Sequence, residues 1–198
     1  MNVTVFEAIN ITKKYRNTLA LNQVSMSVMQ GDIYGFIGEN GAGKTTMIRL
    51  LTGLAEPTTG KIALFGESNK KLAKQRDRIG CIIESPSLYL DMTAYENLEV
   101  QRLQRGIPGK GCIDNALALV GLKDTGKKKA KDFSLGMRQR LALAIALLGN
   151  PEFLVLDEPI NGLDPTGIIE LRNLLKRLNK ERGITILICL LYTSDAAD

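Results

Sequence analysis

The sequence predicts an α/β fold built around a mostly parallel central sheet. Apolar runs too short for helices alternate with longer helix-like segments along the 198 residues. Phe153–Leu156 and Ile184–Ile188 are uninterrupted apolar runs, which is the pattern of strands that a parallel sheet buries on both faces. A glycine-rich turn joins a further strand, Asp32–Ile37, to the helix-like segment Lys44–Leu51. Strands that alternate with helices in this way are typical of α/β proteins.

The other elements follow from local patterns. The helix expected over Leu135–Leu148 has clear ends, because Ser134 is a favourable N-cap and Gly149-Asn150-Pro151 interrupts any helix. Residues 86–133 are more charged, and we expect a helical insertion there. Its helices are predicted at Ala94–Gln104 and Ile113–Val120. The remaining strands are predicted at Val3–Ile11, Ala20–Val28, Lys61–Phe65 and Ile79–Ile83.

Composition excludes several classes of protein. Hydrophobic residues at 44% and charged residues at 24% are those of an ordinary soluble domain. The longest apolar run, Leu141–Leu148, is much shorter than the ~20 residues that cross a bilayer, and no basic-then-apolar leader opens the chain. We therefore expect a protein that is not secreted. Its three widely spaced cysteines are expected to be free thiols in a reducing cytosol.

Charge and histidine content narrow the function further. The net charge of +5 is modest, and the one dense basic run, residues 127–131, is typical of a solvated loop. A nucleic-acid partner is therefore not expected. The chain contains no histidine, which excludes histidine acid–base chemistry and histidine-ligated metals.

Residues 38–45 read GENGAGKT and fit the phosphate-binding pattern G-x-x-x-x-G-K-[ST]. The glycines allow left-handed backbone angles, so successive N–H groups can surround phosphate oxygens at the start of the following helix. Lys44 is expected to reach the β- and γ-phosphates, and the hydroxyl of Thr45 to bind Mg²⁺. The residues predicted to contact the nucleotide in this segment are Gly38, Asn40, Gly41, Ala42, Gly43, Lys44, Thr45 and Thr46.

A second nucleotide feature lies far downstream, where the apolar strand Phe153–Leu156 ends in Asp157 and Glu158. A buried strand would deliver Asp157 beside the Mg²⁺, and Glu158 could orient the water that attacks the γ-phosphate. An apolar run followed by an acid is a weak signal alone. Together with the phosphate-binding loop, this strand and its two acids indicate a nucleoside triphosphatase.

The order of the motifs resembles that of the ATP-binding cassette (ABC) ATPases. The segment SLGMRQ, upstream of Asp157, resembles their LSGGQ-type signature motif, and the segment after Glu158 resembles their D-loop. Tyr15 stands where the family has an aromatic residue that stacks on adenine. The matching signature residues are Ser134, Leu135, Gly136, Met137, Arg138 and Gln139, and the matching D-loop residues are Asn161, Gly162, Leu163 and Asp164.

The resemblance implies a P-loop NTPase fold over residues 2–188, with an N-terminal antiparallel β subdomain and a helical subdomain at about residues 86–150. It implies an ATPase that uses ATP and Mg²⁺. It also implies two partners: a second ABC chain whose signature completes the ATP site, and an integral membrane permease. The permease would hold the pair of ABC chains at the cytoplasmic face of the cell membrane. Within the family the motifs look like those of bacterial drug and peptide-antibiotic exporters, including the bacitracin and lantibiotic self-protection type. The implied catalytic residues are Glu158, Lys44 and Glu84, and the implied metal ligands are Thr45, Glu84 and Asp157.

Two positions depart from the family pattern. Glu84 replaces the Q-loop glutamine; its carboxylate can bind Mg²⁺ but cannot donate hydrogen bonds, and this replacement favours the lantibiotic-immunity subgroup. Leu191 stands where the family has a histidine that contacts the γ-phosphate. Residues 189–198 no longer resemble the family, and we expect them to be a foreign tail joined to a truncated frame.

Three other functions match parts of the sequence. A P-loop GTPase is disfavoured because Asp164–Gly167 fits D-x-x-G but no N-K-x-D guanine-binding motif occurs. A nucleotide-binding regulatory module without turnover is favoured by the absence of histidine and opposed by Asp157 and Glu158. ABC ATPases of repair or translation carry two cassettes or long insertions, for which 198 residues leave no room.

Overall fold

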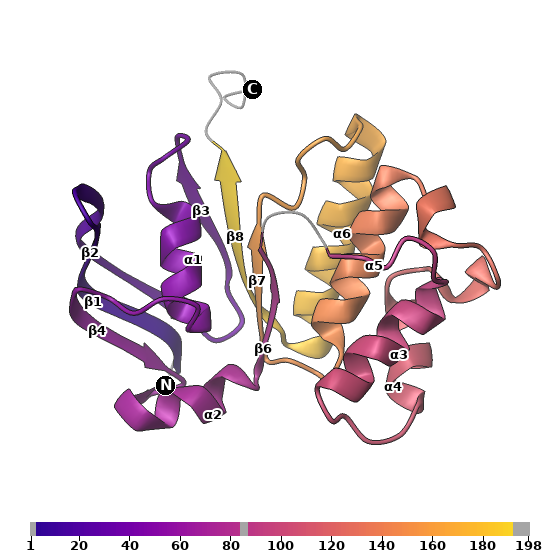
Figure 1. Ribbon diagram of the computed structural model, residues 1–198, viewed down its shortest axis with the longest axis horizontal. Helices are drawn as coiled ribbons and strands as arrows, with labels where there is room; N and C mark the ends of the chain where they lie inside the picture. The colour runs from indigo at the N-terminus through magenta and orange to yellow at the C-terminus, as the bar shows by residue number, and fades with distance from the viewer. Residues whose placement is uncertain (1–2, 84–86, 192–198) are drawn as a thin grey trace.

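The computed structural model describes residues 3–83 and 87–191, which form two sheets with helices between and beside them (Figure 1). The first sheet has the order β2-β1-β4-β5, and its neighbouring strands are antiparallel. The N-terminal antiparallel β subdomain is therefore present, and its first hairpin is longer than predicted. Its strands are β1 (Thr4–Tyr15), β2 (Thr18–Met29), β4 (Thr59–Leu64) and β5 (Glu67–Ser68).

The second sheet is parallel throughout, with the order β3-β8-β7-β6. All five residues of β7 are buried, as the apolar run predicted. The carboxyl ends of parallel strands meet at one edge, which is uppermost in Figure 1, and ligands bind beyond such an edge in open α/β sheets. The strands are β3 (Ile33–Gly38), β6 (Ile79–Ile82), β7 (Phe153–Asp157) and β8 (Thr185–Leu191).

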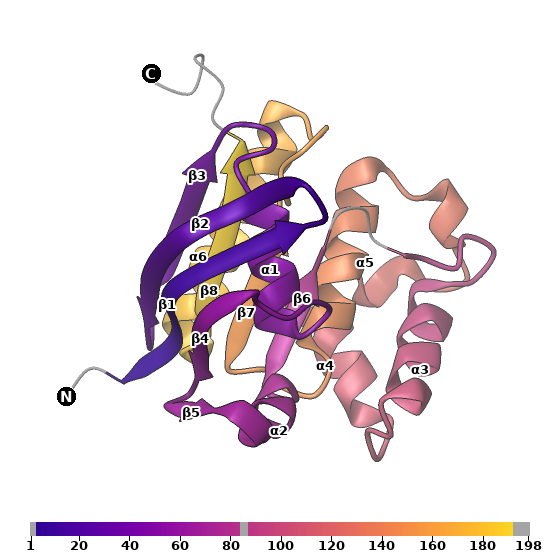
Figure 2. The ribbon, with the colours of Figure 1, turned by 60° about the vertical axis from the view of Figure 1, so that its left-hand side comes forward.

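Helix α1 (Lys44–Thr52) lies between the two sheets (Figure 2). Its Met47, Ile48 and neighbouring leucines are fully buried against both sheets. Alternate residues of β7 contribute to two cores: Phe153 and Val155 pack on the α1 side, and Leu154 and Leu156 pack on the opposite side. Each such side chain contributes about 1.5–3 kcal/mol by leaving water.

The other face of the parallel sheet is covered by α5 (Leu135–Leu147) and α6 (Pro165–Arg182) (Figure 1). Beside them lie α3 (Ala94–Gln104) and α4 (Gly111–Leu119), which form the predicted helical insertion with α5. Helix α3 begins in a capping box, because Thr93 and Glu96 each bind the other's backbone N–H. The short helices are η1 (Asn69–Lys71), α2 (Leu72–Arg76), η2 (Lys123–Thr125) and η3 (Ala130–Asp132).

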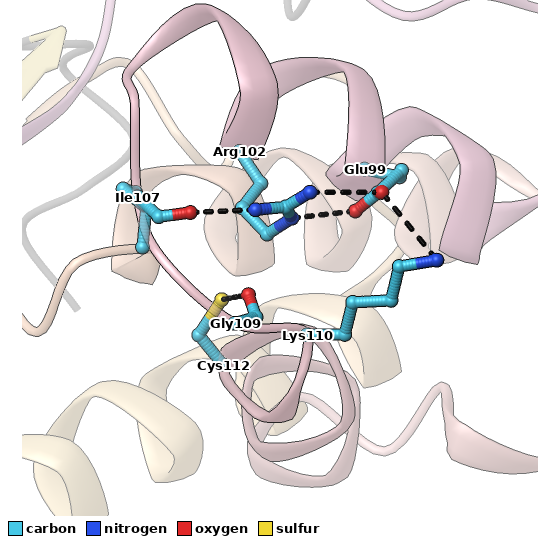
Figure 3. Close-up of polar contacts among 6 residues, drawn as sticks. All are labelled: Glu99, Arg102, Ile107, Gly109, Lys110 and Cys112. Atoms are coloured by element: carbon cyan, nitrogen blue, oxygen red, sulfur yellow. Dashed lines mark hydrogen bonds and ion pairs between the residues drawn. The ribbon is translucent and has the colours of Figure 1, made fainter.

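An ion-pair cluster holds the end of α3 to the loop that leads into α4 (Figure 3). The Arg102 guanidinium donates to both carboxylate oxygens of Glu99 at 2.6 and 2.9 Å and to the carbonyl of Ile107 at 2.6 Å. Lys110 adds a weaker contact, 3.8 Å from its Nζ to Glu99 Oε1. These bonds lower the pKa of Glu99, chiefly through the hydrogen bond from Arg102. Because Arg102 bonds both Glu99 in α3 and the carbonyl of Ile107 in the loop, the cluster fixes a turn in the helical insertion.

The structure also differs from the sequence prediction in two helices and at the end of one strand. Helix α6 was not predicted, although Asp164 caps its first turn, Pro165 opens it and Gly183 ends it in the left-handed conformation. Helix α2 was also missed. Strand β8 continues to Leu191, so the parallel sheet runs three residues past the boundary drawn at residue 188. The three cysteines are free, as expected.

Among the residues that the structure describes, no helix is both long and apolar enough to cross a bilayer.

Candidate nucleotide-binding site

The phosphate-binding loop connects β3 to α1, the context that its sequence pattern requires. Gly41 and Gly43 adopt φ values of 82° and 90°, which side chains rarely tolerate. A Cβ at Gly43 would also lie 2.5 Å from the carbonyl oxygen of Ala20, so only glycine fits where the loop passes strand β2. The predicted loop is confirmed in its position between strand and helix. Its individual ligand contacts stay predictions.

Lys44 folds back across this loop. Its Nζ donates to the carbonyl oxygens of Gly38 and Glu39 at 2.7 and 2.8 Å, and the residue is only 5% exposed. An ammonium group has three N–H donors, so one remains for a further acceptor. A nearly buried cation with a spare donor, at the positive end of a helix, is arranged for an anionic ligand.

Thr45 and Asp157 connect the loop to the end of β7. The hydroxyl of Thr45 donates to Asp157 Oδ2 at 2.8 Å. Asp157 is 3% exposed, and its other oxygen, Oδ1, has no hydrogen-bond partner among the described residues. An unpartnered carboxylate oxygen in a buried position is costly unless a ligand satisfies it.

The donor set suits Mg²⁺ in particular. Mg²⁺ takes one or two protein oxygens and completes its shell with waters and substrate phosphates. Within the described parts of the chain, no group of three or more His, Cys, Asp or Glu could hold a metal ion alone. A cation held by Thr45 and Asp157 would complete its shell with waters and with phosphate oxygens bound at the adjacent loop.

Glu158 leaves β7 in an unusual conformation. Its φ of 48° is left-handed, and its N–H donates to the carbonyl oxygen of Cys189 in β8 at 3.0 Å. Strained backbone of this kind is often found at functional sites. The Cys189 side chain is buried, and burial, with a smaller contribution from the Asp157 charge, raises the pKa of its thiol to about 12. The thiol therefore stays neutral beside the carboxylates at physiological pH.

The segment that resembles the signature motif begins α5. Ser134 Oγ accepts from the Met137 N–H at 3.2 Å, which confirms Ser134 as the N-cap. The Arg138 guanidinium donates to the carbonyl oxygens of Ala130 and Lys131 at 3.2 and 2.7 Å, fixing the start of α5 to η3. Leu135 is half exposed at 50%. Gly136, Met137, Arg138 and Gln139 are partly buried.

The segment that resembles the D-loop touches this helix start in the same chain. Gly162 adopts a φ of 74°, and a Cβ there would come within 3.2 Å of Leu135 Cδ2. Leu163 lies beside Gly136, since a Cβ at Gly136 would be 4.0 Å from Leu163 Cδ2. Sequence reasoning named both motifs but gave no signal that they are in contact. Asn161 and Asp164 are exposed.

The phosphate-binding loop and the start of α5 lie on opposite sides of the parallel sheet (Figure 1). Helix α1 packs in one core and α5 in the other, so β8, β7 and β6 separate them. The N-terminus of α5 therefore does not face the loop of its own chain.

Of the three remaining predicted positions, the structure describes Tyr15 and Leu191. Tyr15 lies at the end of β1, 41% exposed, with the Lys13 ammonium 4.7 Å from its ring centroid. Leu191 pairs with Gly38 across β8 and β3, which places it at the entrance of the phosphate-binding loop. Glu84 lies outside the described residues.

Comparison with known proteins decides the family. The model of the ABC transporter family matches residues 21–161. The chain belongs to the ABC transporter family. It is 50% identical over 186 residues to the "Bacitracin transport ATP-binding protein BcrA" of Bacillus licheniformis, covering 93% of this chain and 61% of that protein. It is 44% identical over 181 residues to the "Lantibiotic transport ATP-binding protein SrtF" of Streptococcus pyogenes, covering 90% of this chain and 76% of that one.

Solved structures show the same ABC ATPase fold. The cbiO1 protein of Clostridium perfringens, described as part of the transporter complex cbiONQ, aligns with a TM-score of 0.87 at 29% identity, covering 96% of this chain and 79% of that one. The cassette MJ0796, a dimer in a post-hydrolysis state with ADP and Pi, aligns with a TM-score of 0.80 at 26% identity, covering 97% and 90%. The predicted fold class and the ABC resemblance are thus confirmed. The chain spans about three fifths of the two BcrA proteins, 61% and 60%.

Proposed function

We propose that this chain is the ATP-binding and ATP-hydrolysing subunit of a membrane exporter of peptide antibiotics or drugs. One observation carries the nucleotide part: the Lys44 ammonium, the Thr45 hydroxyl and a buried, unpartnered Asp157 oxygen are placed around a single glycine-rich loop. The exporter part is supported by the identity to the bacitracin and lantibiotic transport proteins.

Each residue of the site has a proposed role in binding or hydrolysing ATP. Backbone N–H groups of residues 38–45 and the start of α1 would hold the phosphates, with Lys44 on the β- and γ-phosphates. Thr45 and Asp157 would hold Mg²⁺, with Glu84 as a further expected ligand; the ion would neutralise charge on the phosphates. Glu158 would orient the attacking water and accept its proton. Tyr15 would stack on the base.

A second cassette chain is the first proposed partner. The α5 N-terminus lies across the sheet from its own phosphate-binding loop, so Ser134 and Gly136 would complete the site of another chain. The dimeric relative MJ0796 supports this arrangement. Either a second copy of this chain or a related chain would supply an α5 start of this kind.

An integral membrane permease is the second proposed partner. The permease would carry the exported molecule and would hold the cassette pair at the cytoplasmic face of the membrane. The relative cbiO1, which is part of a transporter complex, supports such an assembly.

Turnover measurements test this function. We expect the chain to bind ATP alone and to hydrolyse it faster when co-expressed with the permease. Cells that express both chains should survive more bacitracin or lantibiotic than cells that express the permease with a Glu158→Gln variant. ATP binding without turnover in either setting would instead favour a regulatory nucleotide-binding module.

A further inference from the structure

A lysine contacts the aromatic ring that is expected to receive the base. Lys13 lies two residues before Tyr15 on β1, and its Nζ is 4.7 Å from the centroid of the Tyr15 ring. Ammonium groups within about 6 Å of an aromatic centroid are attracted to the face of the ring. The same Nζ donates to the carbonyl oxygen of Glu56 at 2.7 Å. Lys13 is therefore held at two points, and one of them is the ring.

The carbonyl that holds Lys13 belongs to the segment after α1, the helix that the phosphate-binding loop begins. Two more hydrogen bonds join the same two segments. The Thr58 N–H donates to the carbonyl of Thr12 at 2.8 Å, and the Lys14 N–H donates to Thr58 Oγ1 at 3.0 Å. The end of β1 is thus fixed to the loop between α1 and β4, and Lys13 connects this loop to the Tyr15 ring.

We propose that Lys13 is a positioning residue for nucleotide binding: it holds the Tyr15 ring against its ammonium and leaves the opposite ring face for the base. The inference rests on the proposed function, in which the loop binds the phosphates and Tyr15 stacks on the base. A ring that is already ordered loses less side-chain entropy when a base stacks on it, so affinity is gained without a direct contact between Lys13 and the nucleotide.

The experiment compares two ligands on the full chain. Lys13→Met keeps the aliphatic stem and removes the ammonium, and it should bind ATP about 3- to 10-fold more weakly than the wild type in calorimetry. Inorganic tripolyphosphate has no base, so its affinity should be unchanged, which also shows that the phosphate-binding loop is intact. Lys14→Met is the matched control, because it removes the same charge from the adjacent, exposed residue.

Two further variants separate positioning from a general effect. Lys13→Arg should restore most of the ATP affinity, because a guanidinium can both stack on the ring and donate to the Glu56 carbonyl. In a Tyr15→Ala background, Lys13→Met should have no further effect on ATP affinity, because the ring through which it acts is gone.

Several results would overturn the inference. An equal loss of ATP and tripolyphosphate affinity would show that Lys13 acts only through its charge, and an undiminished effect in the Tyr15→Ala background would show that it does not act through the ring. Unchanged or tighter ATP binding by Lys13→Met would refute the role of Lys13 but would not contradict the proposed function. A wild-type chain that bound no ATP would remove both.

Discussion

Thr45 and Asp157 are 112 positions apart in sequence, yet the hydroxyl of one donates to the carboxylate of the other at 2.8 Å. The bond joins the start of α1 to the end of β7. Strand β7 and β3, the strand that precedes the loop, flank β8 in the parallel sheet. The bond leaves Asp157 Oδ1 buried and unpartnered among the described residues. The pair therefore leaves one carboxylate oxygen without a partner close to the start of α1, where the phosphate-binding loop ends.

Removal of Lys44 should weaken nucleotide binding. The Lys44→Ala variant loses a charge-assisted hydrogen bond worth about 1.5–3 kcal/mol, so ATP affinity should fall by about 10- to 150-fold. Isothermal calorimetry with ATP and Mg²⁺ measures this. Thermal unfolding of the same variant serves as the control, and unchanged ATP affinity would mean that the loop does not hold the phosphates as proposed.

Asp157→Asn should separate metal binding from nucleotide binding. The amide is nearly the same size and its oxygen can still accept the hydrogen bond from Thr45, but the negative charge that attracts a cation is lost. We expect ATP affinity without Mg²⁺ to be unchanged or slightly higher, and the gain in affinity on adding Mg²⁺ to disappear. Equal Mg²⁺ dependence in the variant and the wild type would contradict the proposed role of Asp157.

Glu158→Gln should bind ATP, fail to hydrolyse it and accumulate as a dimer. Glutamine can adopt the left-handed φ of 48° as well as glutamate can, so the turn after β7 should be preserved. Turnover assays and sedimentation with saturating ATP and Mg²⁺ test both parts. Adding Gly136→Asp should abolish the dimer, because it places a negative charge at the α5 start that would meet the phosphates of the other chain. A strictly monomeric Glu158→Gln variant would argue against a shared site.

Local sequence patterns predicted the phosphate-binding loop and the buried strand that ends in Asp157, because both are set by residue type. Gly41 and Gly43 supply positive φ, and the apolar run before Asp157 is that of a buried strand. Helix α6 was missed even though it has clear caps and leucines at helical spacing. Its N-cap Asp164 was interpreted as the end of a D-loop, and its first residues only as part of a D-x-x-G match.

Other relationships in the site depend on tertiary packing, which the local pattern does not encode. The Lys13 ammonium donates to the backbone carbonyl of Glu56. Every residue carries such a carbonyl, so the sequence gives no indication of which one accepts this bond. The contact between Gly162 and Leu135 joins two motifs that only the packing of α6 beside α5 brings together.

Leu191 should limit the rate of hydrolysis. It pairs with Gly38 at the entrance of the phosphate-binding loop, and its side chain has no hydrogen-bonding group that could stabilise charge on the transferring phosphoryl group. One well-placed donor at such a site is worth on the order of 10²–10³ in rate. Leu191→His should therefore raise ATP turnover by up to about that factor with little change in ATP affinity, as measured by steady-state phosphate release and calorimetry. Leu191→Phe introduces a ring of comparable size without a donor and should leave turnover at the wild-type level. If the wild type already hydrolysed ATP as fast as Leu191→His, a histidine at this position would contribute nothing to the reaction in this chain.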